Sequence, residues 1–281
     1  MPELPEVQTT VDDLNRKVRG RRIVAAWHDW PKFKAVEKAK GHTISGVRRL
    51  AKNILFHLGD SHLLLVHQKM TGHLLVGKWQ IEGRKIIPLA PAELKEKVNN
   101  YIHFILTLDN GQMIGFSDLR KFGKVVFGTK EEIEDLPDLK KLGPDALAVN
   151  YRQFAERVRK RRKTIYQTLM DQTVISGIGN IYANDILWQA RLSPFKLASR
   201  LTGAELKLLH RTIKPILVKA FKARGTSIDD YRDTAGKKGR YAASRLVYQR
   251  EGESCRRCRA TILRKKQGGR SVHYCPKCQG R

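Results

Sequence analysis

The four cysteines near the C-terminus constrain the fold more than any other feature of this sequence. All of them lie within the last 27 of the 281 residues, as two C-x2-C pairs separated by sixteen residues. This spacing is typical of a structural zinc site, because each pair presents two thiolates from one tight turn and two such turns complete a tetrahedron. The sequence therefore predicts one structural zinc ion per chain, bound by Cys255, Cys258, Cys275 and Cys278.

Two disulfides in a secreted module are the alternative for the same cysteines. The sequence starts with an acidic, proline-containing segment and not with the basic and apolar regions of a signal peptide, which favours zinc. No apolar run approaches the roughly 20 residues needed to cross a bilayer. We therefore expect a cytoplasmic protein that does not bind membranes. Because four thiolates close the metal shell, His273 is expected to be a strand or surface residue and not a ligand.

The charge balance predicts a polyanionic partner. Lys and Arg number 55 against 27 Asp and Glu, which gives a formal net charge of +28. Such an excess repels itself in a compact fold unless a polyanion neutralises it. Lys and Arg side chains bind phosphates and release counterions, so nucleic acid is the expected partner. A generic basic protein, such as a ribosomal protein, is the less specific interpretation of the same charge.

The first half of the chain reads as a helix followed by antiparallel strands. Apolar residues at helical spacing follow the acidic start, and Gly20 should end this helix. From about residue 22 to 128 the apolar period changes to two, which is typical of strands with one buried face. Asp109-Asn110-Gly111 is a hairpin turn signal between two such runs. The segment therefore predicts an antiparallel β-sandwich or barrel.

The second half reads as a connection, a helical domain and a loop. A charged stretch with Pro and Gly, residues 131–144, should connect two domains. Helical spacing of apolar residues covers about 151–224, where Pro215 is expected to kink or shorten the last helix. Residues 225–239 are rich in Gly, Asp, Thr and Lys and have little periodicity, a composition typical of a mobile loop.

The N-terminus carries a possible nucleophile. Once Met1 is removed, Pro2 has a free secondary amine, and Glu3 places a carboxyl group one residue away. An α-amino group titrates at about 7.7–8.0, so a usable fraction is unprotonated at neutral pH. Such an amine can attack an electrophilic carbon and form an iminium. Many chains have a proline at position 2 without any such role, so this pattern needs support from the rest of the sequence.

A glycine-rich corner joins two predicted helices at Ser176-Gly177-Ile178-Gly179-Asn180-Ile181-Tyr182. Glycines let the backbone pass close to a partner, and the helix that follows points free N–H groups toward an anion. The amide of Asn180 could add a donor to a phosphate. An ordinary packing corner with Asn180 as a helix N-cap is the alternative.

Taken in order, these features resemble the formamidopyrimidine-DNA glycosylase family, bacterial repair enzymes for oxidised purines. The resemblance covers nearly the whole length and implies an α+β fold: an N-terminal antiparallel β-sandwich with an N-terminal helix, a helix-two-turn-helix domain and a C-terminal zinc ribbon. The implied segments are a catalytic domain at 1–135, a DNA-binding domain at 145–225, a mobile lesion-capping loop at 226–245 and the zinc ribbon at 246–281.

The resemblance also implies catalytic roles. Pro2 would attack C1′ of the damaged nucleoside and leave a Schiff base, and Glu3 would donate the proton that helps to open the ribose. Lys52 matches the family lysine of β-elimination, and Arg270 matches the arginine of δ-elimination that grips phosphates beside the lesion. The alternatives are a first-turn acid beside a helix N-terminus for Glu3 and a surface strand lysine for Lys52.

The implied DNA-binding residues fall into two groups. Met70, Arg120 and Phe122 match the trio that fills the gap when the damaged nucleotide leaves the duplex, and Phe122 is able to wedge between bases. Core packing is the alternative for Met70 and Phe122. His67, Arg161 and Asn180 match positions that bind phosphates around the flipped nucleotide.

Four positions at three sites depart from the family pattern. Tyr101 stands where the family often has a histidine, with His103 two residues further on. Tyr166 replaces a family lysine near the helical corner, and the Gln68-Lys69 pair before Met70 is unusual. None of these positions is the predicted nucleophile, acid, wedge or zinc ligand, so activity is still expected.

The sequence therefore predicts a DNA glycosylase and AP lyase that excises 8-oxoguanine and formamidopyrimidines and nicks by β,δ-elimination. The resemblance implies a monomer that acts on damaged double-stranded DNA in the bacterial cytoplasm, associated with the nucleoid through this binding. One alternative is an endonuclease VIII-like glycosylase for oxidised pyrimidines, although Leu4 and the Arg120/Phe122 wedge favour purines. A second is a non-catalytic zinc-ribbon protein that binds nucleic acid, which retention of Met1 would favour.

Overall fold

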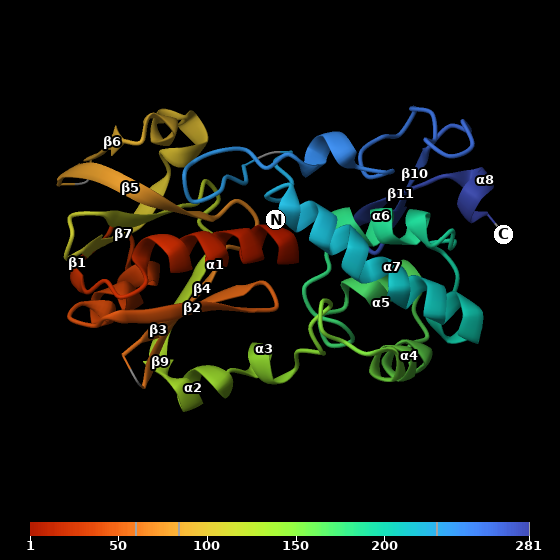
Figure 1. The fold of residues 1–281 in the computed structure, drawn as a ribbon, viewed down its shortest axis with the longest axis horizontal. Coiled ribbons are helices and arrows are strands. Elements are labelled where there is room, and N and C mark those ends of the chain that lie inside the picture. Colours follow the sequence, from red (N-terminus) through yellow and green to blue (C-terminus); the bar gives the residue numbers. More distant parts are fainter. Residues whose placement is uncertain (60, 84, 229, 281) are drawn as a thin grey trace. The chain divides into compact units, whose positions relative to one another are not determined.

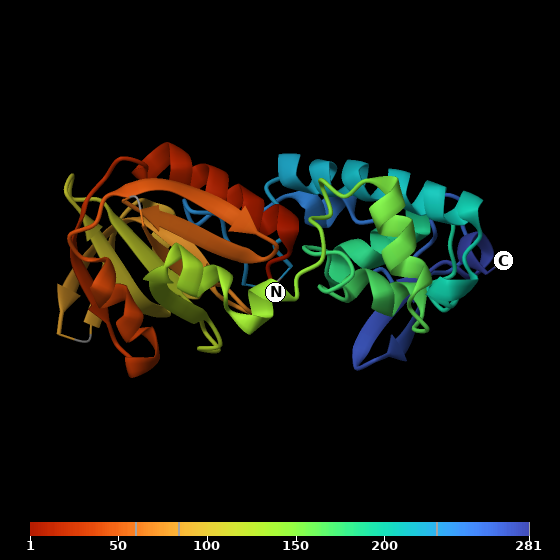
Figure 2. The ribbon, with the colours of Figure 1, turned by 90° about the horizontal axis from the view of Figure 1, so that it is seen from below.

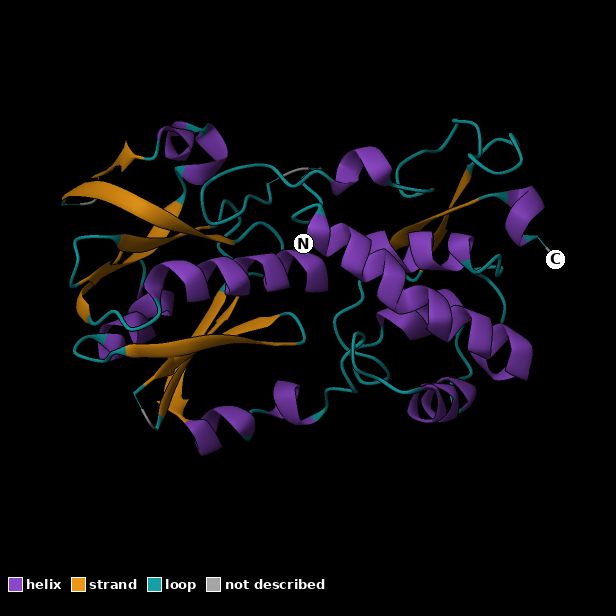
Figure 3. Ribbon diagram, viewed as in Figure 1, coloured by secondary structure: helices purple, strands orange, loops and turns teal. Residues whose placement is uncertain are grey.

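The computed structural model describes residues 1–59, 61–83, 85–228 and 230–280, and these form two compact units. The first unit combines Met1–Lys140 with Ala223–Ala242. The second combines Lys141–Lys222 with the chain from Ala243 onward. Figures 1 and 3 show strands concentrated in the first unit and helices in the second. The mixed α+β class predicted from the sequence is confirmed.

Two antiparallel sheets form the first unit. One sheet has the strand order β1-β7-β8-β5-β6 and the other β2-β3-β4-β9. The predicted turn at Asp109–Gly111 joins β7 to β8, and Gly111 has a φ of +76°, which glycine adopts without the strain of a Cβ. The strands are β1 (Ile23–His28), β2 (Ile44–Leu50), β3 (Asn53–Leu58), β4 (His62–His67), β5 (His73–Glu82), β6 (Lys85–Ala90), β7 (Ile102–Leu108), β8 (Met113–Ser117) and β9 (Lys124–Thr129).

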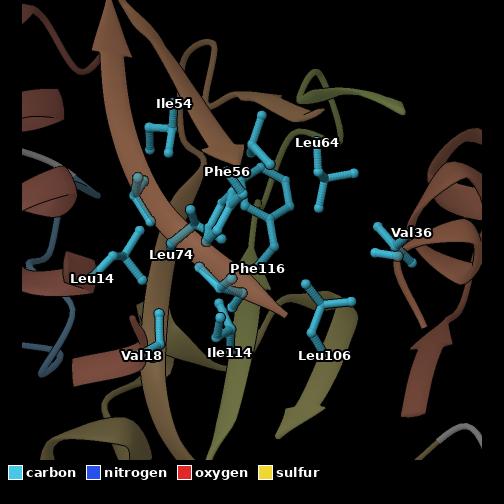
Figure 4. Close-up of a cluster of buried hydrophobic side chains, with 14 of the residues drawn as sticks. Leu14, Val18, Val36, Ile54, Phe56, Leu64, Leu74, Leu106, Ile114 and Phe116 are labelled. Carbon is cyan, nitrogen blue, oxygen red and sulfur yellow. The ribbon is translucent and has the colours of Figure 1, made fainter. Parts of the chain in front are cut away.

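Helix α1 (Leu4–Val18) closes the core of this unit. It contacts β2, β3 and β5, and therefore both sheets, and lies along the opening between them (Figures 1 and 2). Its residues at helical spacing, Leu14 and Val18 among them, pack with strand residues such as Phe56 and Phe116 in one buried cluster (Figure 4). Each such side chain stabilises the fold by about 1.5–3 kcal/mol. The N-terminus is thus attached to a rigid helix.

Short helices complete the first unit. Helix α2 begins with a capping box, in which Thr129 Oγ1 accepts from the Glu132 N–H and Glu132 Oε2 accepts from the Thr129 N–H. Helices α2 and α3 lie in the stretch that the sequence predicted as a connection between domains. The short helices of this unit are η1 (Pro31–Ala39), η2 (Ala92–Lys95), η3 (Lys97–Asn99), α2 (Lys130–Glu134) and α3 (Pro137–Lys140).

The second unit is built around α6, which contacts α5, α7, α8 and β11. The expectation that Pro215 shortens the last long helix is wrong, because α7 continues to Lys222 (Figure 1). The proline removes one backbone bond, but Leu209, Ile213 and Leu217 stay buried on either side of it. The elements are α4 (Tyr151–Arg159), α5 (Ile165–Met170), α6 (Asn180–Gln189), η4 (Ala198–Arg200), α7 (Gly203–Lys222), β10 (Leu263–Gln267), β11 (Arg270–Tyr274) and α8 (Pro276–Gln279), with η5 (Tyr241–Ser244) before the hairpin.

In the described part of the chain, no helix combines the length and apolar character that crossing a membrane requires.

Candidate active site and zinc centre

The predicted nucleophile and acid lie at the start of α1. Pro2 is buried and Glu3 is only 2% exposed, whereas Met1 is exposed. Glu3 is the N-cap residue of the helix, and its backbone N–H donates to Oε2 of Glu6 at 2.8 Å. Glu3 therefore lies at the helix N-terminus, as the alternative interpretation expects, but as the N-cap residue and not in the first turn. Its burial places the carboxyl group away from bulk water, at the N-terminus of the helix.

Lys52 lies in the tight turn between β2 and β3. Its side chain is only 6% exposed, so the alternative of a surface strand lysine is wrong. Asn53 closes the turn through Nδ2, which donates to the Leu50 carbonyl at 3.1 Å. Ala51 has a φ of +55°, a conformation that costs a non-glycine residue about 1 kcal/mol. The turn that carries the buried Lys52 thus contains one non-glycine residue in the left-handed region.

His67 ends β4 as a neutral imidazole. Its Nδ1 accepts a hydrogen bond from the Lys69 N–H at 2.9 Å, so the proton of the neutral ring is on Nε2. Burial, followed by repulsion from the Lys69, Lys52 and Lys124 ammonium groups, lowers the pKa of His67 to about 3. The repulsion places Lys52 in the electrostatic surroundings of His67. A neutral His67 with Nε2–H can donate to a phosphate oxygen without carrying charge.

This neutral histidine should make the protein sensitive to acid. Below about pH 6.5 the unfolded chain binds a proton at His67, whereas the folded chain does so only near pH 3. Unfolding therefore takes up a proton in this window, and stability falls as the pH falls through it. At pH 5 the loss should be about 2 kcal/mol. Urea denaturation of His67→Gln should show a smaller loss between pH 7.5 and 5 than wild type, and His42→Gln is the control. Equal losses in wild type and His67→Gln would contradict the assignment.

Met70, Arg120 and Phe122 form an exposed surface on turns of the first unit. Met70 is 42% exposed and Phe122 is 48% exposed, so the alternative that they pack in the core is wrong. The Arg120 guanidinium lies over the Phe122 ring, 4.6 Å from its centroid. Large apolar side chains gain nothing from contact with water. Their exposure beside a cation is what a wedge between stacked bases requires.

A buried carboxylate that sequence reasoning missed holds this surface together. Asp118 Oδ2 accepts from the Gly123 N–H at 2.7 Å, and its Oδ1 accepts from the Thr71 hydroxyl. The same Thr71 Oγ1 accepts from the Arg120 N–H at 3.1 Å. The turn of Met70 and the turn of Arg120 and Phe122 are thus fastened to each other. The sequence signal for this network is Asp118 itself. It stands between two apolar strand segments, where a buried carboxylate needs internal hydrogen-bond donors.

Removing the Thr71 hydroxyl should loosen the wedge. Thr71→Val keeps the shape of the side chain but leaves Asp118 Oδ1 and the Arg120 N–H without their shared partner. We expect a loss of about 1–3 kcal/mol in unfolding free energy and weaker binding to lesion duplexes. Thr43→Val is the control, because it makes the same substitution at an exposed residue of the same unit. Wild-type stability and affinity in Thr71→Val would show that this network does not hold the wedge.

Several residues at or near the positions that depart from the family pattern are buried in the first unit. His103 is buried, with Nδ1 2.8 Å from Asp29 Oδ2 and Nε2 3.0 Å from the Asp118 carbonyl, so it supports the wedge turn from behind. Tyr101 is only partly exposed. Gln68 is 1% exposed, while Lys69 has a φ of +53°. His103 therefore cannot replace the DNA contact that Tyr101 puts in doubt.

The segment predicted as a lesion-capping loop is bound to α1 in the described residues. Glu6 Oε1 accepts from the Thr226 N–H at 2.7 Å, and the buried Tyr231 hydroxyl donates to the Glu6 carbonyl at 3.3 Å. Arg224 pairs with Asp13 and Asp233. Residue 229, inside the predicted 226–245 segment, lies outside the described residues. Glu6 thus contacts both the N-terminal residues and this segment, and the predicted mobility stays a prediction.

In the second unit, Asn180 and Arg161 lie near the helical corner. Gly179 is the N-cap of α6 and Asn180 its first residue, so the N-cap alternative for Asn180 is wrong. Gly177 has a φ of +102°, which explains a glycine at this point of the corner. Arg161 Nη2 donates to Thr173 Oγ1 at 3.1 Å. With Arg157, it lines a cleft of about 620 Å³, a basic concavity on this unit.

Arg270 lies at the tip of the β10–β11 hairpin. Gly268 and Gly269 form its two-residue turn with φ of +56° and +73°, and Arg270 pairs with Gln267 across it. Gln267 Nε2 donates to Thr164 Oγ1 at 2.9 Å, which fixes the tip against the start of α5. The exposed guanidinium of Arg270 is therefore presented from an anchored hairpin.

The four cysteines come together as the spacing predicts. Their Sγ atoms lie within 4.8 Å of one another, with Cys255 to Cys278 at 3.9 Å and Cys258 to Cys275 at 3.4 Å. A zinc tetrahedron with Zn–S near 2.3 Å has edges of about 3.8 Å, so the four thiolates fit this metal. The Trp188 indole N–H donates to Cys255 Sγ at 3.3 Å and supports the thiolate. This is a closed, structural zinc site.

His273 is a buried residue of β11, in agreement with the expectation of a strand position. The predicted site residues thus form two sets, one in each unit. The first set comprises Pro2, Glu3, Lys52, His67, Met70, Arg120 and Phe122, and the second comprises Arg161, Asn180, Arg270 and the zinc ligands.

Models of protein families match three stretches of the chain. The formamidopyrimidine-DNA glycosylase N-terminal domain matches residues 1–125, and the formamidopyrimidine-DNA glycosylase H2TH domain matches residues 142–232. The zinc finger found in FPG and IleRS matches residues 252–280.

Whole-length relatives agree with these matches. The chain is 37% identical to formamidopyrimidine-DNA glycosylase of Chloroflexus aurantiacus, over 99% of this chain and 98% of that protein, and 34% identical to that of Heliobacterium modesticaldum, over 99% and 100%. Among solved structures, Lactococcus lactis Fpg with abasic-site DNA is similar at a TM-score of 0.87 and 30% identity, covering 99% of this chain and 100% of that one. The same Fpg with oxidised-pyrimidine DNA gives 0.86 and 31% over the whole of both chains. This chain belongs to the formamidopyrimidine-DNA glycosylase family.

Proposed function

We propose that this chain excises oxidised purines from duplex DNA through Pro2 and then nicks the strand at the resulting site. It is a DNA-formamidopyrimidine glycosylase with the AP lyase activity of its family, and its partner is damaged DNA. The observation that carries the residue assignment is the buried pair of Pro2 and Glu3 at the rigid start of α1. An amine and a carboxylic acid held side by side in a buried site can act in the same reaction, the amine as the nucleophile and the acid as the proton donor.

The proposed chemistry starts once Met1 is removed. The Pro2 nitrogen bonds to C1′ as the bond from C1′ to the base breaks, and the base leaves with a proton. Glu3 gives a proton to the ring oxygen, the ribose opens, and an iminium joins Pro2 to C1′. Loss of a proton from C2′ then expels the 3′-phosphate, and loss of a proton from C4′ expels the 5′-phosphate. Water finally hydrolyses the iminium, which releases the sugar remnant as an aldehyde and restores the Pro2 amine. Lys52 serves the first elimination, while Arg270 binds the phosphates and serves the second.

The remaining residues bind and open the duplex. Met70, Arg120 and Phe122 fill the space that the extruded nucleotide leaves, and their exposure supports this role. His67, Arg161 and Asn180 bind backbone phosphates, and the net charge of +28 supports a large sequence-independent part of the affinity. The four thiolates hold a structural zinc ion and take no part in the chemistry. We further propose that the protein is a cytoplasmic monomer that associates with the bacterial nucleoid through DNA.

Oxidised pyrimidines are a second candidate substrate class. The observation in favour is that Lactococcus lactis Fpg, similar to this chain over its whole length, is known in complex with an oxidised pyrimidine containing DNA. Matched duplexes that differ only in one lesion, 8-oxoguanine or thymine glycol, separate the two classes. We expect faster single-turnover excision of 8-oxoguanine. Faster excision of thymine glycol would contradict the purine assignment, and no excision of either, with Met1 retained in the intact mass, would favour a binding protein.

A further inference from the structure

A chain of hydrogen bonds in the second unit fixes the side chain of Asn180. Its Oδ1 accepts from the Tyr166 hydroxyl at 2.5 Å and from Asn184 Nδ2 at 3.1 Å. Asn184 Nδ2 also donates to the Asn180 carbonyl at 2.6 Å, and Asn184 Oδ1 accepts from the His273 N–H at 2.6 Å. These four bonds join α5, α6 and the β11 strand of the zinc ribbon.

The bonds determine which way both amides point. A backbone N–H can only donate, so the atom of Asn184 that faces His273 must be the oxygen. Asn184 therefore turns its Nδ2 toward Asn180, and the atom of Asn180 that meets it must again be an oxygen. Nδ2 of Asn180 then lies on the opposite side of its amide, at the partly exposed N-terminus of α6. The orientation of Asn180 is thus set by a backbone group of the zinc ribbon.

Tyr166 strengthens this orientation. Its side chain is fully buried, and its hydroxyl lies 2.5 Å from Asn180 Oδ1 but 3.4 Å from the Ser271 carbonyl. A phenol has a single hydrogen to donate, and the shorter distance assigns it to Asn180. Oδ1 of Asn180 thus accepts from two donors. Rotating this amide by 180° would be costly, because Asn180 Nδ2 would then face the Nδ2 donor of Asn184. A lysine at position 166 would bring a charged donor, whereas tyrosine gives a neutral one.

We propose that Tyr166 and Asn184 are positioning residues that hold the Asn180 amide with Nδ2 directed at a DNA phosphate. This inference rests on the proposed function, since it assumes the phosphate contact of Asn180. It gives the departure at Tyr166 a role in DNA binding. It also makes the zinc ribbon a part of the phosphate site through the His273 backbone, and not only a support for Arg270.

A double-mutant cycle on DNA binding tests the inference. The variants are Tyr166→Phe, Asn180→Ala and their combination, and the probe is a duplex with a tetrahydrofuran abasic analogue, which the protein binds but cannot process. Tyr151→Phe is the matched control, because it removes one hydroxyl bonded to the Gly203 carbonyl at 3.3 Å in the same unit. We expect Kd to rise about tenfold in Asn180→Ala and about threefold to tenfold in Tyr166→Phe, with no change in Tyr151→Phe.

The combination decides between positioning and simple stability. If Tyr166 acts through Asn180, Tyr166→Phe adds no loss in the Asn180→Ala background. Asn180 is neutral, so the slope of log Kd against log salt should stay at the wild-type value, whereas Arg270→Ala should reduce it by about one. Additive losses, or a Tyr166→Phe affinity equal to wild type, would overturn the inference. Wild-type protein that binds this duplex but cuts no lesion would refute the proposed function and not the positioning role. The double-mutant cycle measures binding alone, so it would still test that role.

Discussion

Replacing Pro2 with glycine should lower single-turnover excision of 8-oxoguanine by roughly a thousandfold. Glycine keeps an N-terminal amine, but a primary one on a backbone that proline no longer restricts. A secondary amine forms an iminium directly, and the pyrrolidine ring of Pro2 is buried at the start of α1. The loss should therefore fall on the chemical step and leave binding to a tetrahydrofuran duplex within about twofold of wild type.

The excision rates of wild type and Pro2→Gly can be compared only when Met1 is removed from both proteins. Intact mass must show Met1 removed from wild type and from Pro2→Gly, because a retained methionine blocks either amine. Glu3→Gln is the companion variant: it keeps the amine and the side-chain size, and loss of a general acid should slow excision by about 10²–10⁴-fold. Excision by processed Pro2→Gly at the wild-type rate would show that another group attacks C1′.

Removing one zinc ligand should abolish tight DNA binding. Cys258→Ala leaves three thiolates, and apparent zinc binding energies of about 10–16 kcal/mol in small zinc modules are also folding energies. The β10–β11 hairpin with Arg270, and the His273 N–H that fixes Asn184, belong to the same ribbon. We expect less than one zinc per chain by atomic absorption and a Kd for abasic-site duplex raised by at least about a hundredfold.

Ser254→Ala is the matched control for this variant. Ser254 precedes Cys255 and is exposed, so its loss removes a hydroxyl beside the metal site without removing a ligand. It should bind one zinc and keep wild-type affinity. Full DNA affinity in a zinc-free Cys258→Ala protein would show that the ribbon takes no part in holding the duplex.

Much of the fold could be predicted because its signals are local. The period-two pattern of residues 22–128 reports which face of each strand is buried, and the cysteine spacing reports a geometry that few arrangements satisfy. The expectation that Pro215 shortens the last helix is wrong because packing overrides a local rule. A helix survives one missing hydrogen bond when the apolar residues around it, such as Ile213 and Leu217, remain buried.

Only part of the site could be predicted from the sequence, because many of its contacts join residues that are far apart along the chain. Lys52, Met70 and Phe122 came from matched motifs, but their burial or exposure depends on tertiary packing that no local pattern encodes. Asp118 joins Thr71, 47 residues away, and Asn184 meets His273, 89 residues away. The neutral state of His67 likewise arises first from burial in the folded chain, and then from lysines that include Lys52 and Lys124 on other segments. Such networks become visible only once the chain is folded.

Borohydride reduction during the reaction tests the central claim most directly. The reagent converts an iminium between enzyme and opened sugar into a stable amine, and peptide mass mapping then identifies the residue that carries the sugar. The adduct is expected on the N-terminal peptide, at the nitrogen of Pro2, in wild type and not in a protein that keeps Met1. An adduct on Lys52 or another lysine, or no adduct while the lesion is still excised, would contradict the account.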